Sequence, residues 1–459
     1  MKLRNIHCVT LAAGAALLLS GCHIYKKYET PQTSALTRAY VEARKAPVDS
    51  TAFGNLLWEN VFTDPVLADL INRALVNNKD LDNARLNVEI AHAQMKGARL
   101  SYLPSVALAP NGAGASYAGS DINWTYQLPV QVSWEVDIFG KTLNRKRGAE
   151  IAYKMSESYA QATRSQIIAA VASTYYAIAA VNSQLELTRS TAVLWGESVQ
   201  TMKDFKLAGR VTEAAVVQSN AQYYSIQASI TDLEVQLNQL NNTMSLLLNE
   251  MPQNWNITTT LDFEKPEIVR SAIPMVELAS RPDVEAAERA LAVAYYATNS
   301  ARAAFYPGLS ITAGGGFTNL LGSFIQNPGD WFYQLAGSLV MPLFSRGQNI
   351  ANLEASKAKQ KQAMNNFEYA VLNASAEVSN ALTVYEKSAE KELLLAEQVE
   401  NLKKSVDYTQ DLLRYSTGTY LEVLTAQQSL LAAQTSFIAS RLSQARAFIN
   451  LYQALGGGR

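Results

Sequence analysis

The chain has 459 residues, of which 48% are hydrophobic and 17% are charged, and its formal net charge is −1. A charge balance so close to zero gives no basis for binding nucleic acid or an anionic membrane surface, so neither partner is predicted. The length alone would suggest about three domains, but the long helices that the sequence predicts argue against that division.

The first residues have the pattern of a bacterial signal peptide. A basic start precedes an apolar run that is shorter than the about 20 residues needed to span a bilayer. Two small residues and a cysteine follow the apolar run. The basic start is Lys2 and Arg4, the apolar run is Val9–Leu19, and the residues after it are Ser20, Gly21 and Cys22. Leu19–Cys22 resembles the lipobox of bacterial lipoproteins, so we predict a signal peptide at 1–21 and a lipid on Cys22. An ordinary secretory signal with an incidental cysteine is the alternative.

Removal of the signal would also remove Cys8, which leaves Cys22 as the only thiol and makes an internal disulfide impossible. His23 follows the cysteine, not the Asp that retains some lipoproteins at the inner membrane. One lipid-modified cysteine is a weak to moderate anchor, so a second means of membrane attachment is expected.

Residues 22–57 are polar and contain two prolines, which favours an extended linker that contributes to an equatorial segment. The next helix begins at Asp64-Pro65, with Asp as the cap and Pro in the first turn. A further helix is predicted from Asp80 to Arg99, and Leu103-Pro104 ends it.

Two strand-like runs follow. The first, Ser105 to Tyr117, is rich in Gly and Ala. The second alternates strictly, with apolar residues at every even position; they are Trp124, Tyr126, Leu128, Val130, Val132, Trp134, Val136 and Ile138. Such a long two-faced strand is typical of a tilted membrane strand with lipid on one side and water on the other. A half-buried strand of a soluble sandwich is the alternative.

Two segments predict helices of exceptional length. Gln348 to Thr417 contains neither Gly nor Pro, and Lys141 to Leu207 contains only Gly148 and Gly196 as breaks. The first would be about 105 Å long at about 1.5 Å per residue. Helices of this length indicate either a coiled-coil scaffold or the wall of a tube. Thr212 to Met251 is a second Gly- and Pro-free segment that returns along the first helix.

The pattern then recurs. Gly97-Ala98-Arg99 with Leu103-Pro104 matches Ser300-Ala301-Arg302 with Tyr306-Pro307, and Gly209, Glu213 and Gln218 match Gly418, Glu422 and Gln427. The predicted domains are a first repeat at 58–251, a connector at 252–280 and a second repeat at 281–459. The first repeat holds a β-hairpin at 103–138 and a helical hairpin at 140–251; the second holds them at 306–344 and 346–455.

Four membrane strands cannot close a barrel, which needs about eight. Open strand edges are not tolerated in lipid. Several chains must therefore share one barrel, and the long helices attached to its strands must also form a ring. The sequence thus predicts an obligate homo-oligomer without fixing its number.

These features together resemble the outer-membrane efflux protein family, the TolC-like outer-membrane factors, in the lipoprotein branch called the NodT type. The matching pieces are Trp58, Phe62 and Asp64-Pro65; Asn77-Asn78-Lys79-Asp80-Leu81; Trp134-Glu135-Val136-Asp137-Ile138-Phe139-Gly140; Arg281-Pro282-Asp283-Val284; Pro342-Leu343-Phe344; Thr419-Tyr420-Leu421-Glu422-Val423-Leu424; and Leu451-Tyr452-Gln453-Ala454-Leu455-Gly456-Gly457-Gly458. Each piece is weak alone, but their order on the repeat is specific.

The resemblance implies a mainly α chain with membrane β-strands, four per chain. A homotrimer would form a twelve-stranded β-barrel in the outer membrane and an α-helical barrel across the periplasm. A mixed equatorial domain would girdle this tunnel. The family implies an exit duct that moves drugs or other small molecules, joined by a periplasmic adaptor to an inner-membrane pump, most often a proton-driven multidrug transporter. Within the class of export ducts, the alternative is an outer-membrane duct for type I protein secretion. The alternative from a different class is a structural coiled-coil trimeric lipoprotein.

No enzyme chemistry is predicted, and no cofactor apart from the lipid on Cys22. The mature chain has only His23 and His92 as histidines, and Gly140-Lys141-Thr142 lacks the first Gly of a phosphate-binding loop.

The resemblance assigns adaptor docking to two helix-turn-helix tips. Their residues are Gly209, Arg210, Val211 and Thr212 in the first tip, and Gly418, Thr419, Tyr420 and Leu421 in the second. Glycines that only make turns are the alternative. Asp407 and Asp411 are four apart on one helix face, so they are candidates for a periplasmic gate. A solvated outer face is the alternative for this pair.

Overall fold

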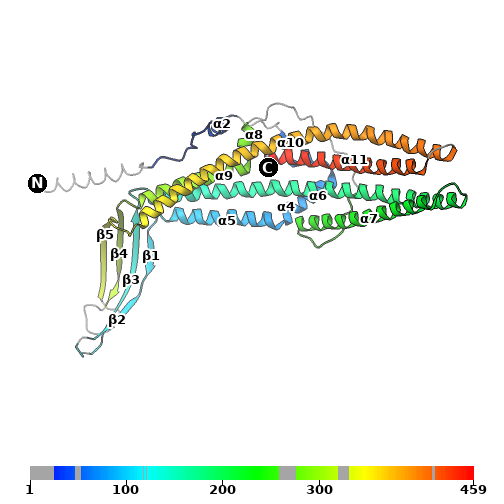
Figure 1. The fold of residues 1–459 in the computed structure, drawn as a ribbon. Helices are drawn as coiled ribbons and strands as arrows, with labels where there is room; N and C mark the ends of the chain where they lie inside the picture. Colours follow the sequence, from blue (N-terminus) through cyan, green and yellow to red (C-terminus); the bar gives the residue numbers. More distant parts are fainter. Residues whose placement is uncertain are drawn as a thin grey trace. The chain divides into compact units, whose positions relative to one another are not determined.

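A computed structural model describes residues 25–46, 53–116, 118–119, 121–257, 275–318, 330–415 and 419–458 (Figure 1). Cys22, the signal peptide and Gly418 lie outside the described residues. The helices are α2 (Ala35–Ala43), η2 (Phe53–Asn55), α3 (Trp58–Val61), α4 (Pro65–Asn77), α5 (Lys79–Leu100), α6 (Lys141–Leu207), α7 (Glu213–Leu247), α8 (Met275–Ala279), α9 (Pro282–Ala303), α10 (Gln348–Tyr415) and α11 (Tyr420–Ala454). The strands are β1 (Ser105–Leu108), β2 (Asn111–Ala115), β3 (Asn123–Val136), β4 (Gly308–Thr318) and β5 (Asp330–Val340).

The order of elements repeats along the chain. A helix, a β-hairpin, a very long helix and a return helix occur twice, first as α5, β1 to β3, α6 and α7, then as α9, β4, β5, α10 and α11. The long helices have 67 and 68 residues and both return helices have 35, so the two copies agree closely in length. The expected internal duplication is therefore present in the structure.

The N-terminal segment differs from the extended linker expected at 22–57. Residues Ala35–Ala43 form helix α2, in which Tyr40 and Ala43 are buried. Ser34 and Thr37 bond each other at the start of this helix, where the Ser34 Oγ accepts from the Thr37 N–H at 3.2 Å. A serine three residues before a threonine is a local helix-start signal, and the mixed polar composition concealed it.

The chain divides into two compact units, which are described separately. The first comprises the described parts of 1–38, 86–158 and 285–369 and holds the whole sheet. The sheet is antiparallel in the order β1-β3-β4-β5, and β2 also pairs with β3. Ala109 N–H donates to the Pro129 carbonyl at 3.0 Å, and β1 and β2 pair with β3 in one continuous register. The predicted first strand is thus interrupted at Pro110, because proline has no N–H for the ladder.

The two faces of this sheet differ in chemistry. The strand register sets apolar residues opposite one another on one face, including Leu128 against Phe317 and Phe317 against Trp331. The exposed members of this apolar face are Val106, Leu108, Trp124, Leu128, Val130, Trp134, Phe317, Trp331, Tyr333, Leu335 and Leu339. The opposite face carries Gln131, Ser133 and Glu135 of β3. Such alternation is that of a membrane strand.

The second unit comprises the described parts of 39–85, 159–284 and 370–459. Its main core joins α4, α6, α7 and α11 through fully buried side chains such as Leu67, Ile71 and Ile178. Burial of each such aliphatic side chain stabilises the fold by about 1.5–3 kcal/mol. Asp64 begins α4 as predicted, since its Oδ1 accepts the N–H of Val66 at 2.8 Å. Its other oxygen accepts from the Tyr175 hydroxyl at 2.7 Å and so ties α4 to α6.

Three consecutive glycines close the C-terminal side of this core. A Cβ on Gly457 would lie 2.5 Å from the Tyr452 ring, so only glycine fits there. The Tyr452 hydroxyl donates to the Leu56 carbonyl at 2.6 Å and accepts from the Gly458 N–H at 2.9 Å. The C-terminal turn and the segment before α3 are therefore joined through one tyrosine.

Among the described helices, none is both long and apolar enough to cross a membrane.

Candidate functional site

The first hairpin tip is a complete Schellman turn. Gly209, the second residue after α6, has φ +72°. Its N–H donates to Lys206 O at 2.9 Å, and the Arg210 N–H donates to Phe205 O at 2.8 Å. These are the two hydrogen bonds that define the motif, and they require a left-handed residue at Gly209. The glycine therefore has a structural role in the tip, whatever else the tip binds.

Two contacts of charged side chains hold this tip together. The Arg210 guanidinium lies 4.8 Å from the centroid of the Phe205 ring, and Lys206 forms an ion pair with Glu213 across the turn. Arg210 and Thr212 are exposed, and Val211 is half-buried. The tip thus presents a short loop with the exposed cation of Arg210 at its apex.

The second tip is described from Thr419 onward. The Glu422 Oε2 accepts the Thr419 N–H at 3.0 Å, which satisfies a free donor at the start of α11. Leu421 is exposed, whereas Tyr420 is buried, with only 8% of its surface exposed. The Tyr420 hydroxyl lies 2.5 Å from Ser219 Oγ on α7, and burial raises the pKa of Tyr420 although the bond from Ser219 opposes the rise.

The two hairpins share one small core near their tips. Its buried members come from α6, α7 and α11; they are Ala192, Trp195, Met202, Val216, Ile226, Tyr420 and Leu424. Tyr420 was predicted as a docking residue, but the structure places its ring in this core. The exposed side chains of the predicted tips are those of Arg210, Thr212, Thr419 and Leu421.

Asp407 and Asp411 are both exposed on α10. Arg414 follows them by seven and three residues, so it lies on the same helix face. Within the described residues, neither carboxylate forms an ion pair. The face therefore carries charges of both signs. Its assignment to a gate stays a prediction.

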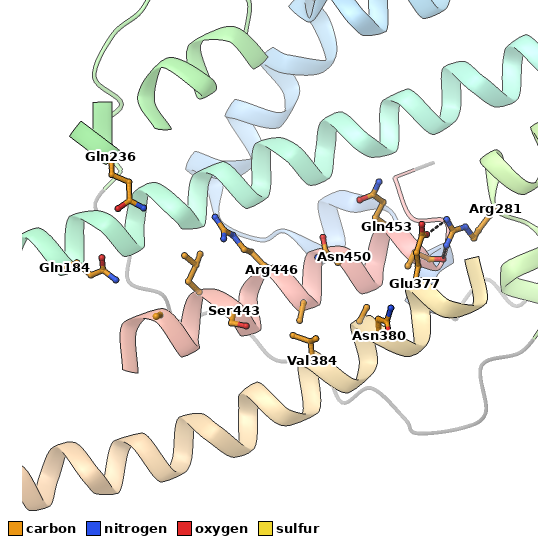
Figure 2. Close-up of a pocket in the computed structure, with 15 residues that line it drawn as sticks. Gln184, Gln236, Arg281, Glu377, Asn380, Val384, Ser443, Arg446, Asn450 and Gln453 are labelled. Atoms are coloured by element: carbon orange, nitrogen blue, oxygen red, sulfur yellow. Dashed lines mark hydrogen bonds and ion pairs between the residues drawn. The ribbon is translucent and has the colours of Figure 1, made fainter. Parts of the chain in front are cut away.

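A cavity of about 780 Å³ lies in the second unit (Figure 2). We call it the amide hollow because its walls carry the side chains Gln184, Gln236, Asn380, Asn450 and Gln453, together with Arg281, Glu377, Val384, Ser443 and Arg446. The α11 residues among them recur every three or four positions, so they form one polar stripe. The opposite face of α11 carries Phe448, Ile449 and Tyr452 into the main core. Sequence reasoning did not find this stripe.

One corner of the amide hollow is held by a buried arginine. The Arg281 guanidinium donates to Asp283 Oδ2 at 2.7 Å, to Glu377 Oε2 at 2.6 Å and to the Ala454 carbonyl at 2.7 Å. Burial alone would lower the pKa of Arg281, but its bonds to Asp283 and Glu377 raise it. Burial would likewise raise the pKa of Asp283, but the bonds and charge of Arg281 lower it.

No group of three His, Cys, Asp or Glu side chains within the described ranges could hold a metal ion. The geometry is that of walls, turns and polar hollows.

Comparison with known proteins gives this geometry a family. The model of the family described as "Outer membrane efflux protein" matches residues 70–250 and again residues 274–457. This chain belongs to the outer membrane efflux protein family. As a member of this family it is an outer-membrane efflux channel protein and not an enzyme, which confirms the predicted family, location and absence of catalysis.

Relatives match over almost the whole chain. The toluene efflux pump outer membrane protein TtgC of Pseudomonas putida is 30% identical, over 97% of this chain and 94% of its own. SilC of Salmonella typhimurium, named a probable outer membrane lipoprotein, is 28% identical over 98% of both chains. The solved open state of the MtrE outer membrane channel of Neisseria gonorrhoeae is 26% identical, covers 95% of this chain and 97% of its own, and has a TM-score of 0.80. The predicted fold class of long helices with a membrane sheet is confirmed.

Proposed function

We propose that this chain is the exit duct of a tripartite efflux system and acts as a homotrimer that conducts drugs or other small molecules out of the cell. The observation that carries the proposal is the four-stranded width of the sheet. Along the described strands, β5 and the β1–β2 strand have no neighbour on their outer sides, while the apolar face is of membrane type. An open sheet of this kind needs partners to close it.

The amide hollow supports a lumen-facing assignment for one stripe of α11. The core side of α11 packs on Phe62, whose ring lies 5.8 Å from the Tyr452 ring. That side belongs to the girdle that the family resemblance assigns to the outside of the tunnel. We therefore assign Arg446, Asn450 and Gln453, on the opposite side, to the tunnel wall, where an amide-rich surface stays hydrated and offers hydrogen bonds to passing solutes.

The partners follow from the tips and the N-terminus. We assign adaptor docking to Gly418 and to the exposed tip residues Arg210, Thr212, Thr419 and Leu421, with Gly209, Val211 and Tyr420 shaping the described parts of the two turns. An inner-membrane pump would supply energy and select the substrate. A lipid on Cys22 would add a second membrane attachment to that of the barrel.

The proposal is tested with the full-length protein and its neighbours. Mass measurement in detergent should give three chains, and the purified protein should conduct in planar bilayers. Deletion of the gene should raise drug sensitivity and leave protein secretion unchanged. A monomer that stays folded in detergent-free buffer, or loss of a secreted protein with normal drug resistance, contradicts the proposed role.

A second test concerns the tips. A photoreactive residue at position 210 or 421 should cross-link to the periplasmic adaptor, whereas the same residue at position 128, on the apolar face of the sheet, should not. Equal capture from all three positions would contradict docking at the tips.

A further inference from the structure

The start of α6 joins the sheet to the helices of the first unit and carries an unusual density of cations. Lys141, Arg145, Lys146 and Arg147 fall within its first seven residues. The Asp137 Oδ2 caps this helix by accepting the Leu143 N–H at 2.6 Å. Cations at a helix N-terminus oppose the helix dipole, so these four residues are poorly explained by helix stability alone.

The four cations do not share one environment. Lys146 lies 5.7 Å from the centroid of the Tyr102 ring, and Arg147 donates to the Tyr25 carbonyl at 3.5 Å. Lys141 instead reaches back to Glu135 of β3, with Nζ 2.9 Å from Oε1. Arg145 is exposed and has no ion-pair partner within the described residues.

Lys141 and Arg145 line a second cavity, of about 680 Å³, which we call the junction hollow. One face of α6, which carries Lys141 and Arg145, forms one wall of this cavity. Residues of α9, including Tyr296 and Ser300, form a second wall, and Asn349 and Asn352 of α10 complete the lining. Among the residues that line the junction hollow, the charged ones are Glu135, Lys141 and Arg145. One negative and two positive side chains give the hollow a net positive charge.

The register of the sheet tells which side of the wall this hollow occupies. Glu135 pairs with Ser310 of β4, which pairs with Ser338 of β5, so it belongs to the polar face. The apolar face, with Trp134 next to it, is the one suited to lipid. Because Glu135 lines the junction hollow and binds Lys141, the hollow lies toward the polar face of the sheet, the face that a shared barrel would turn to its pore.

We propose that Lys141, Glu135 and Arg145 form a cationic collar where the pore of the sheet meets the helices, and that the collar favours anionic solutes. This inference rests on the proposed channel, whose symmetry would repeat the net positive charge around the lumen. Charges in a confined, partly desolvated passage attract counter-ions more strongly than the same charges on an open surface. The compensated pair fixes the position of Lys141, and Arg145 supplies the excess charge.

The test is the reversal potential of the assembled channel in planar bilayers under a potassium chloride gradient. Arg145→Gln should lower the chloride-to-potassium permeability ratio by about twofold or more at 0.1 M salt, and the effect should shrink at 1 M, where the Debye length falls from about 10 Å to about 3 Å. Lys141→Gln should act in the same direction, and Glu135→Gln should raise the ratio. With an organic carboxylate in place of chloride, the same order is expected.

Lys146→Gln is the matched control, because it removes one charge at the next position but outside the hollow. Arg145→Lys, which keeps the charge, should retain the wild-type ratio and guards against a folding defect in the glutamine variant. An unchanged ratio in Arg145→Gln, or an equal shift in Lys146→Gln, overturns the collar. A wild-type protein that does not conduct at all contradicts the proposed channel instead.

Discussion

The Arg281 guanidinium lies 2.6 Å from Glu377 Oε2, although 96 positions separate the two residues along the chain. The same guanidinium caps the Ala454 carbonyl near the end of α11. One side chain that is only 6% exposed thus fastens the start of α9 to the two helices of the second hairpin. Because the partner carboxylates are about half-exposed, solvent screens part of the attraction.

Replacement of Arg281 by Gln should lower the free energy of unfolding by about 1–3 kcal/mol, less than for a fully buried pair because of that screening. Thermal unfolding in detergent, followed by circular dichroism, measures the change. Lys387→Gln removes a fully solvated ion pair with Glu390 and should leave stability unchanged. Equal effects of both substitutions would contradict the fastening role.

The lowered pKa of Asp283 predicts a specific acid response. A carboxyl group whose pKa is lower in the folded state stabilises the fold above its unfolded pKa of about 3.9, and this contribution is lost as the pH falls through the folded value. Asp283→Asn should therefore be less stable than wild type at pH 6, and the difference should shrink as the pH falls below about 3.9. A difference that stays constant as the pH falls below about 3.9 would mean that hydrogen bonding, and not charge, accounts for it.

Adjacent residues of β3 allow a paired test of the sheet's orientation. Val130→Arg places a cation on the apolar face and should cost about 2–4 kcal/mol if that face meets lipid. Gln131→Arg places the same cation on the polar face and should be tolerated, with altered conductance. Yield of assembled protein in outer-membrane fractions measures both. Good yield of Val130→Arg with loss of Gln131→Arg would reverse the assignment.

The Tyr420–Ser219 contact predicts a measurable coupling between the two hairpins. Tyr420→Phe and Ser219→Ala should each cost about 1 kcal/mol, and the double variant should cost less than their sum because both remove one bond. Loss of the contact between α7 and α11 should also make the hairpin tips more mobile and raise the leak of antibiotic through the channel. Strict additivity in the double-mutant cycle would show that the hydroxyls do not depend on each other.

Asp407 and Asp411 predict a conductance effect if they face the lumen. The double substitution to Ala should remove a ring of negative charge and raise single-channel conductance or leak. Unchanged conductance in planar bilayers would place both carboxylates on the outer face.

The long helices could be predicted closely because their evidence is local. The structure begins α6 at Lys141 and ends it at Leu207, as expected. Helix α10 begins at Gln348, as expected, and continues to Tyr415, the last described residue before the turn. Absence of helix breakers and a glycine at the turn suffice for such a prediction. The alternation of β3 was equally local, whereas the break at Pro110 was overlooked within a weak Gly- and Ala-rich run.

The walls of the two hollows could not be predicted, because these helices bury polar residues as well as apolar ones. Thr174 and Thr188 are nearly fully buried, and each donates to the carbonyl four residues earlier, at 2.8 and 2.7 Å. Such self-satisfied hydroxyls pack like small apolar side chains, so polarity along the sequence does not mark the solvent side. Arg281 was noted as part of a motif, but its contacts to Glu377 and Ala454 join distant segments that no local pattern relates.

A chain built from two copies of one pattern offers its partners two unlike versions of the same surface. The turn after α6 carries Arg210 at its apex, whereas the turn before α11 presents Leu421. Around a ring of identical chains the two kinds of tip alternate. Any partner that docks on every tip therefore meets a cationic binding surface and an apolar binding surface in turn. Such a partner must either accept both with one binding surface or bind as two populations with different lifetimes.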